Sequence, residues 1–413
     1  MPRLPLFAVL FALSSAAQAG TLTAWSQYGA DGTVEARVVT DDAACPALSI
    51  DGQDRPMTLR QQPNGAFPVR VCVGSIPFGT KAASAGGVSL PVPVAKPSHI
   101  VLLGDTGCRL KGAQVQGCND ETLWPFHRVA SHAAQEHPDL VIHVGDYLYR
   151  ETPCPATVPQ CAGTPFGDNW PTWNADLFTP GADLLHAAVW IAERGNHEDC
   201  KRAGTGWTVF LGRAPVTEAC QHREQPMLVD LGGVKLAVID DNDASETEVK
   251  QPGTDQLHQD VAAALAAKAD WIVTHHPFRG VSRLSKKATD GKTMDGANPM
   301  LLAALKGADE SGLTLMLSGH IHNFQIENFG GPMPPQLVVG EGGDNLDTEV
   351  PPLLTGLITG GQTIASGMSL PGFGYVVIDR VGDSQDWTIT VHAADGAVMR
   401  HCGLKSRKLS CEG

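Results

Sequence analysis

From residue 98 onward, short apolar runs recur along the chain, and helix-like segments lie between several of them. The clearest helical segments are 121–136 and 254–269, the second with Thr254 as its expected N-cap. Alternating strands and helices predict a layered α/β domain. Strands without helices, expected at 374–379 and 387–392, would form a second sheet of this domain. The apolar runs are 99–103, 140–144, 188–192, 235–239, 271–274, 313–317 and 336–339.

Residues 20–96 have a different pattern and are predicted to form a small β-sandwich domain. Alternating or β-branched runs at 34–39, 57–61 and 68–73 are separated by turn-forming clusters. Residues 91–97 contain three prolines and are expected to be a linker. We therefore expect one domain at 20–96 and a second at 97–413.

The first 19 residues have the features of a signal peptide. Arg3 precedes a short apolar run at 4–13, and Ala17 and Ala19 form a cleavage signal, so we expect cleavage after Ala19. No later stretch is long and apolar enough to span a membrane. The mature protein is therefore expected to be secreted or periplasmic.

The ten cysteines fit an exported protein, in which disulfides persist. They fall in close pairs, and pairing of nearest neighbours is a hypothesis, because sequence alone does not fix connectivity. Buried free thiols are the alternative. The expected pairs are Cys45–Cys72, Cys108–Cys118, Cys154–Cys161, Cys200–Cys220 and Cys402–Cys411.

The formal net charge of −14 disfavours a long nucleic acid as a partner, because the phosphate backbone would be repelled. A small anionic substrate is still compatible with this charge if bound metal ions dominate the local field.

Polar side chains follow five of the expected strands. They occur in Gly104-Asp105, in Gly145-Asp146 with Tyr149 three residues later, in Gly195-Asn196-His197-Glu198, in His275-His276-Pro277 and in Gly319-His320-Ile321-His322. Open α/β sheets place their sites beyond the carboxyl ends of their strands. We therefore expect these side chains to meet at one edge, with the glycines allowing sharp turns of the backbone.

The order GD, GDxxY, GNHE, HxP, GHxH resembles the calcineurin-like metallophosphoesterase superfamily, over residues 98 to about 345. Most of that superfamily has a histidine two residues after the first aspartate, where this chain has Gly107. Together, Gly107 and Tyr149 resemble the purple acid phosphatase branch. Tyr147 is a rival to Tyr149, but the spacing favours Tyr149. The resemblance implies a four-layer α/β/β/α sandwich preceded by the small β-sandwich.

The resemblance also implies two metal ions. Asp105, Asp146, Tyr149 and His322 would hold the first, and Asp146 would bridge to the second, held also by Asn196, His275 and His320. A phenolate and hard oxygens suit Fe(III), whereas an amide and imidazoles suit divalent Zn, Fe or Mn. Such a pair polarises a phosphate and activates a hydroxide that attacks phosphorus.

The implied activity is that of an acid-phosphatase-like hydrolase of small phosphate monoesters. His197 would contact the phosphate or protonate the leaving oxygen, with Glu198 or Asp199 orienting it. His276 and Arg279 are weaker candidates for substrate contacts, because they could equally be solvated loop residues. The alternatives are a phosphodiesterase or nucleotide hydrolase with the same metals, and a non-catalytic protein that binds metal or phosphate.

Overall fold

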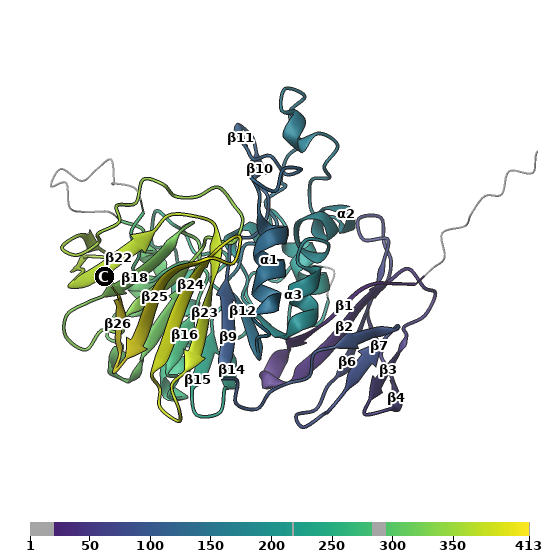
Figure 1. Ribbon diagram of the computed structural model, residues 1–413, viewed down its shortest axis with the longest axis horizontal. Coiled ribbons are helices and arrows are strands. Elements are labelled where there is room, and N and C mark those ends of the chain that lie inside the picture. Colours follow the sequence, from purple (N-terminus) through teal and green to yellow (C-terminus); the bar gives the residue numbers. More distant parts are fainter. Residues whose placement is uncertain (1–19, 217–218, 283–294, 413) are drawn as a thin grey trace, which may run out of the picture.

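The computed structural model describes residues 20–216, 219–282 and 295–412; the expected signal peptide and its cleavage site lie outside them. A large sheet of eleven strands runs through the molecule, with the N-terminal strands at one end and the C-terminal strands at the other (Figure 1). Its order is β26 (Lys408–Cys411), β25 (Val398–Lys405), β24 (Trp387–Ala393), β23 (Gly374–Arg380), β9 (His99–Leu103), β12 (Leu140–His143), β13 (Val189–Ala192), β1 (Thr21–Tyr28), β2 (Val34–Thr40), β6 (Arg70–Ser75) and β5 (Thr58–Gln61).

A second sheet of seven strands faces the first. Strands β15, β16, β17 and β19 are parallel, and antiparallel strands flank them. The order is β14 (Met227–Asp230), β15 (Lys235–Val238), β16 (Trp271–Val273), β17 (Leu315–Ser318), β19 (Gln336–Val339), β18 (Phe324–Asn328) and β22 (Ser366–Leu370).

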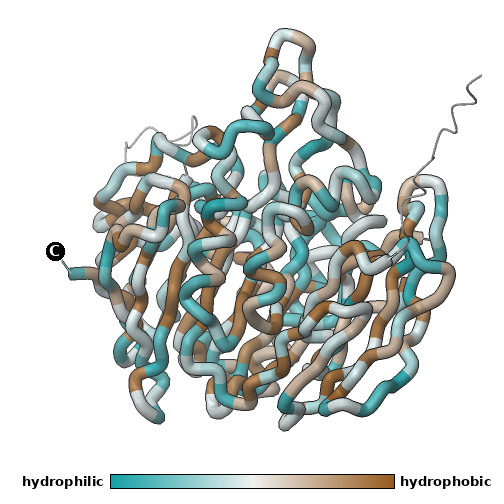
Figure 2. The backbone as a smooth tube through the Cα atoms, turned by 45° about the vertical axis from the view of Figure 1, so that its right-hand side comes forward, coloured by the Kyte–Doolittle hydropathy of each residue, from teal (hydrophilic) through white to brown (hydrophobic). Residues whose placement is uncertain are grey.

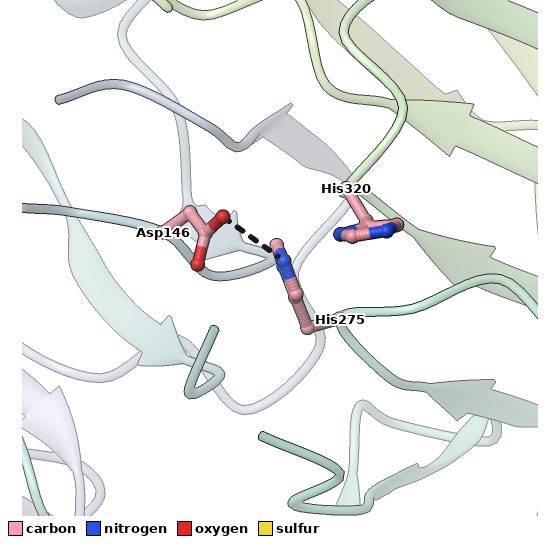
Figure 3. Close-up of side chains that lie close together, drawn as sticks. All are labelled: Asp146, His275 and His320. Carbon is pink, nitrogen blue, oxygen red and sulfur yellow. Dashed lines mark ion pairs between the residues drawn. The ribbon is translucent and has the colours of Figure 1, made fainter. Parts of the chain in front are cut away.

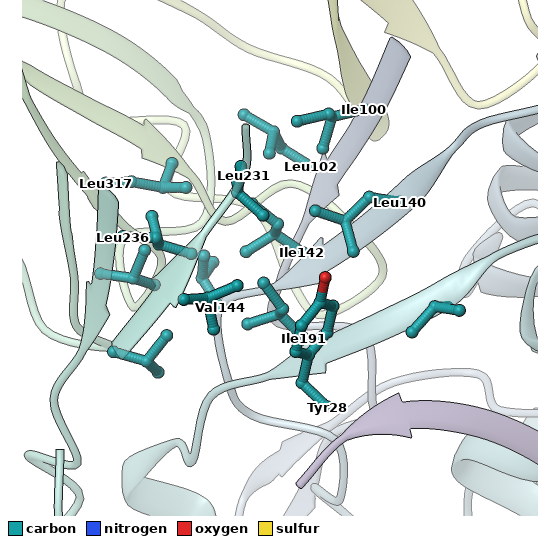
Figure 4. Close-up of a cluster of buried hydrophobic side chains, with 14 of the residues drawn as sticks. Tyr28, Ile100, Leu102, Leu140, Ile142, Val144, Ile191, Leu231, Leu236 and Leu317 are labelled. Atoms are coloured by element: carbon teal, nitrogen blue, oxygen red, sulfur yellow. The ribbon is translucent and has the colours of Figure 1, made fainter. Parts of the chain in front are cut away.

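Side chains that alternate along the strands divide the interior into three apolar layers. On β9, Ile100 and Leu102 point between the two sheets, whereas Val101 and Leu103 point to the opposite face. Figure 4 shows the layer between the sheets, where Ile142 and Val144 lie near Leu236. Hydrophobic stretches follow the strands, and hydrophilic residues gather in the connecting loops (Figure 2). The predicted four-layer α/β/β/α sandwich is confirmed.

Helices cover the two outer faces. α1 (Phe126–Gln135) and α3 (Ala182–Ala187) pack on the large sheet, with the shorter α2 (Trp170–Trp173) and α4 (Gly204–Phe210) beside them. α5 (Gly253–Ala266) and α6 (Pro299–Ala304) pack on the seven-stranded sheet. The helix at 254–269 begins one residue earlier than expected. Thr254 is not its N-cap, because its hydroxyl bonds back to the Lys250 carbonyl at 2.9 Å from inside the first turn.

The C-terminal strands correct one expectation. β23 and β24 do not belong to the second sheet; β23 pairs antiparallel with β9 and so extends the first. The apolar pattern predicts both strands correctly. It does not predict which sheet they join, because that depends on which strand is free to pair with them.

The N-terminal strands form an additional two-layered unit, as expected. A small sheet of β4 (Gln53–Pro56), β3 (Ala47–Ile50), β7 (Ala83–Ala85) and β8 (Val88–Leu90) shares an apolar cluster with β1 and β2. The other layer of this unit is continuous with the large sheet, because β1 pairs parallel with β13 through Gln27 and Trp190. The domain boundary at 96/97 stays a prediction.

All ten cysteines form disulfides, and the five expected nearest-neighbour pairs are confirmed. In the part of the chain that the structure describes, none of the helices has the length and apolar content needed to cross a bilayer.

Candidate metal centre

The polar side chains expected at the strand ends do meet at one edge. β9, β12 and β13 are parallel neighbours in the large sheet and place Asp105, Asp146 and Asn196 at their carboxyl ends. β16 and β17 are parallel neighbours in the facing sheet and contribute His275 and His320. The site therefore lies where the carboxyl ends of both sheets come together.

The backbone turns sharply at three of these positions, although not where we expected. Asp105, Asp146 and His320 themselves adopt left-handed conformations, with φ of 56°, 60° and 67°. Such conformations are costly for residues with a Cβ and collect at functional sites. Of the glycines that precede these three, only Gly145 has a positive φ. Gly195 is needed for space instead, because a Cβ there would lie 2.0 Å from Asp146 Oδ1.

One group of candidate ligands surrounds the hydroxyl of Tyr149. This oxygen lies 3.0 Å from Asp105 Oδ1, 2.6 Å from Asp146 Oδ2 and 3.1 Å from His322 Nε2. His322 Nε2 is also 3.3 Å from Asp105 Oδ1. Tyr147, the rival tyrosine, instead donates to the His143 carbonyl at 3.4 Å inside the core. The structure therefore brings Tyr149 to this group.

A second group surrounds Nε2 of His275, which lies 3.2 Å from Asp146 Oδ2 and 3.1 Å from Asn196 Oδ1. Figure 3 shows Asp146, His275 and His320 directed toward a common space. One ligand atom from each of these three residues lies within 4.8 Å of the other two. Asp146 thus belongs to both groups.

The protons of neutral imidazoles and of one phenol do not satisfy these buried acceptors, so both groups favour added positive charge, from protons or from metal ions. His322 Nδ1 donates to the Asn345 carbonyl at 2.7 Å, and His275 Nδ1 donates to the Val144 carbonyl at 2.8 Å. In the neutral imidazoles, both Nε2 atoms therefore carry lone pairs that face carboxylates. Around Tyr149, three acceptor atoms share one hydroxyl proton. Carboxylate, phenol, amide and imidazole are together a donor set that suits metal ions.

The pKa values of these residues agree with this view. Burial, followed by Asp146 and Asp105, raises the pKa of Tyr149 well above its usual value. The phenol therefore needs a strong positive charge to ionise. Burial disfavours protonation of His275, but Asp146 outweighs it and raises the pKa of this imidazole well above its usual value. The second group thus attracts positive charge as well.

His197 lies beside the two groups. Its ring centroid is 3.9 Å from that of Tyr149, and its backbone amide donates to Asp146 Oδ1 at 2.8 Å. Its Nδ1 lies 2.7 Å from Glu151 Oε1. The expected partner Glu198 is elsewhere, so Glu151 is the carboxylate that is placed to orient His197.

Glu198 is a fully buried anchor for the loop that carries Asp146. It accepts the backbone amides of Asp146, Tyr147, Leu148 and Gly195 at 2.9–3.1 Å. These bonds correct the expectation that Glu198 orients His197. The amides of the loop need an acceptor, and the carboxylate supplies it.

His276 lines a cavity of about 620 Å³ next to the two groups, together with His320, His322 and Arg109. Asp241 accepts a hydrogen bond from Nδ1 of His276 at 2.8 Å. It also accepts hydrogen bonds from the backbone amides of His275 and His276 at 2.8 and 3.1 Å. His276 Nε2 is buried and has no hydrogen-bond partner among the described residues. His276 is therefore fixed in place with one nitrogen left for another group.

Arg279 is not brought to this cavity. Its guanidinium pairs with both carboxylate oxygens of Glu310, at 3.1 and 3.2 Å, and lies over the Phe329 ring. Arg109, by contrast, does line the cavity; it pairs with Asp344 and lies 4.7 Å above the Tyr149 ring. Closeness to His275 in the sequence therefore does not place Arg279 in the site.

Sequence reasoning missed five polar residues of this region. They stand on connecting loops and have no local signal, apart from the acidic pair that contains Asp241. The missed residues are Arg109, Glu151, Asp241, Glu246 and Asp344.

The sequence profile described as calcineurin-like phosphoesterase matches residues 98–324, more than half of the chain. The chain therefore belongs to the calcineurin-like phosphoesterases, and the family inferred from the strand-end motifs is confirmed. Membership of this family indicates a metal-dependent hydrolase. No curated protein sequence matches the chain.

Two solved structures share the fold. Purple acid phosphatase PPD1 from yellow lupin (Lupinus luteus) seeds has a TM-score of 0.57 at 14% identity, covering 93% of this chain and 74% of the lupin chain. A structure of PhoD has a TM-score of 0.52 at 11% identity, covering 95% of this chain and 92% of the PhoD chain. At these identities the likeness concerns the fold alone.

Proposed function

We propose that the protein is an exported phosphatase that hydrolyses small phosphate monoesters with a pair of metal ions. The observation that carries this proposal is the pair of acceptor groups that share Asp146. Asp105, Tyr149 and His322 would complete the first metal site. Asn196, His275 and His320 would complete the second.

The two donor sets differ, and this difference supports an unequal pair of metals. The first contains a phenol and two carboxylates, hard oxygens that suit Fe(III). The second contains one shared carboxylate, an amide and two imidazoles, which suit Zn, Fe or Mn in the divalent state. When bound, such a pair polarises the phosphate and lowers the pKa of a coordinated water.

The chain's own residues would bind the substrate and move protons around this centre. The Nδ1 atom of His197 lies 2.7 Å from Glu151 Oε1, and its ring lies against Tyr149. This placement supports a role in contacting the phosphoryl group or protonating the leaving oxygen. His276 is fixed by Asp241 and offers Nε2 to the cavity, which supports a second polar contact with the substrate. The cavity volume of about 620 Å³ is in the range of small-molecule sites.

Export is supported by two independent features. The N-terminal sequence has the arrangement of a signal peptide with cleavage after Ala19. The five disulfides are typical of proteins that fold in an oxidising compartment.

The test combines metal analysis, a visible absorption spectrum and hydrolysis assays on a phosphate monoester and the matching diester. We expect two metal ions per chain, a tyrosinate–Fe(III) band that Tyr149→Phe abolishes, and faster hydrolysis of the monoester. Asp146→Ala should lose both metals and all activity. One ion per chain at full activity would refute the two-metal site. Faster diester hydrolysis would favour a phosphodiesterase, and metal binding without turnover would favour a non-catalytic protein.

A further inference from the structure

Glu246 lies beside two candidate ligands of the second metal. It stands on the loop between β15 and α5, and its side chain is 54% exposed. Its Oε1 accepts a hydrogen bond of 3.5 Å from Asn196 Nδ2, and its Oε2 lies 4.0 Å from His320 Nε2. One carboxylate thus faces the amide of one ligand and the imidazole of another.

The chemistry of the Glu246–Asn196 contact favours one orientation of the Asn196 amide. An asparagine side chain can bind a metal through its oxygen, whereas its NH₂ group only donates protons. An ionised carboxylate only accepts them. Contact between Glu246 and Nδ2 of Asn196 therefore favours the orientation in which Asn196 Oδ1 faces His275 Nε2, the 3.1 Å contact described above.

The same argument applies to His320. A neutral imidazole carries one N–H and one lone pair, and the group that its N–H meets decides which nitrogen can bind a metal. A carboxylate at Nε2 favours the tautomer with Nε2–H and leaves the Nδ1 lone pair for a cation. Carboxylate–histidine–metal arrangements of this kind orient the ring and raise its basicity as a ligand.

We propose that Glu246 is a positioning residue for the second metal, because its charge faces Asn196 Nδ2 and His320 Nε2 and so favours the metal-binding orientations of both side chains. This inference rests on the proposed function, in which both residues bind that metal. The two carboxylates, Asp241 and Glu246, would then have separate roles. Asp241 binds the backbone amide of His275 from the protein interior, and Glu246 orients Asn196 and His320 from the cavity side.

A competing interpretation places another cation on Glu246 itself. Ligand atoms of Glu246, His276 and His320 lie within 4.8 Å of one another. In that case His320 would have to bind two cations through both nitrogens and give up its remaining proton, which an imidazole of ordinary basicity resists. Positioning requires no such ionisation.

The experiment uses iron-loaded protein whose second metal has been removed with a chelator, and titrates it with Zn(II) alone. Glu246→Ala and Glu246→Gln should weaken Zn(II) binding roughly 10- to 100-fold. Glutamine is included because its amide has one acceptor oxygen and cannot serve both N–H groups. The visible band should not change, since the contacts of Glu246 are to Asn196 and His320 and not to the Tyr149 group. Glu248→Gln is the matched control, on the same loop with a side chain that is 64% exposed.

The outcomes separate this inference from the proposed function. If both Glu246 variants bind Zn(II) as tightly as the wild type, the positioning role is wrong. If the wild type binds two Zn(II) ions beyond iron and Glu246→Ala loses just one of them, the competing cation site is correct. A wild-type protein that shows neither a visible band nor a second metal ion would overturn the proposed function, and this inference with it.

Discussion

The backbone of Gly107 lies directly against the side chain of Tyr149. A Cβ at position 107 would lie 2.8 Å from both Cδ2 and the backbone nitrogen of Tyr149, and 2.7 Å from the Tyr147 carbonyl oxygen. Any side chain at 107 would therefore compete with the tyrosine for space. The absence of a histidine at position 107 and the presence of Tyr149, the two departures from the common superfamily pattern, are thus linked by packing.

We expect Gly107→Ala to displace Tyr149 and to destabilise the protein by roughly 1–3 kcal/mol, the usual cost of overpacking. The tyrosinate band should shift or weaken, because the phenol oxygen moves relative to Asp105 and Asp146. Urea unfolding and the visible spectrum measure the two effects. Gly312→Ala is the control, since nothing lies within 4 Å of a Cβ there. An unchanged spectrum would contradict the packing argument.

His197→Ala should keep both metals and lose about 10²- to 10⁴-fold in kcat, the usual contribution of a positioned proton donor. Glu151→Gln should lose less, because it disturbs only the orientation of the His197 ring. Metal content is measured beside turnover to separate lost chemistry from lost metal. If Glu151→Gln had no effect on kcat while His197→Ala did, the contact between them would have no catalytic role.

Glu198→Gln should destabilise the protein by roughly 1–3 kcal/mol, because an NH₂ group would face backbone N–H donors of the Asp146 loop. Its activity should fall together with metal content, since Asp146 loses its support. Chemical denaturation and metal analysis check this, with exposed Glu248→Gln as the control. A normal stability combined with low turnover at full metal content would instead support the role in orienting His197 that the sequence analysis expects.

Arg279→Met should lower stability by roughly 1–3 kcal/mol and leave KM for a phosphate monoester unchanged. The loss arises because Glu310 is left without its bidentate partner. Glu310→Gln should have a similar effect on stability. A tenfold rise in KM in the Arg279 variant alone would restore Arg279 as a substrate contact.

Glu327 gives a prediction for pH. It is fully buried in β18, and both carboxylate oxygens lack partners among the described residues; the nearby Val281 amide donates to Gln325 at 3.0 Å. Burial raises the pKa of Glu327 well above its usual 4.5. The stabilising effect of the protonated form is therefore present below the unfolded-state pKa and is lost as the pH rises through the folded-state pKa.

Glu327→Gln should remove this dependence and become more stable relative to the wild type as the pH rises. Urea unfolding at about pH 4 and about pH 8 measures the difference. A difference between the two proteins that stays constant across this range would show that Glu327 titrates normally.

Features that depend on local sequence could be predicted. Apolar runs gave the strands, and ligand-type residues directly after them indicated where the site would be, because the carboxyl ends of parallel strands meet at one edge. Tyr149 could be chosen over Tyr147 because its spacing from Asp146 matches that of the purple acid phosphatases, which the motifs resemble. The disulfides followed from cysteines that are close in sequence.

Features that depend on how distant loops meet could not be predicted. Glu151 and Glu246 contact His197 and His320 across loops that no local pattern places. Arg279 follows His275 by four residues, yet its guanidinium finds Glu310 on another segment. Position in sequence therefore identified the strand ends but not the partners that hold them.

The parallel pairing of β1 with β13 has a consequence for how the enzyme can be assembled and divided. β1 lies inside the large sheet and pairs with β13, the strand that leads to Asn196. The paired residues Gln27 and Trp190 are about 160 positions apart in the sequence, so this contact is long-range. A fragment that starts at the proline-rich linker would leave β13 as a bare edge open to other chains. The segment that carries the candidate metal ligands is thus not structurally independent of the N-terminal strands. A chimaera that replaces these strands must supply another strand that pairs with β13.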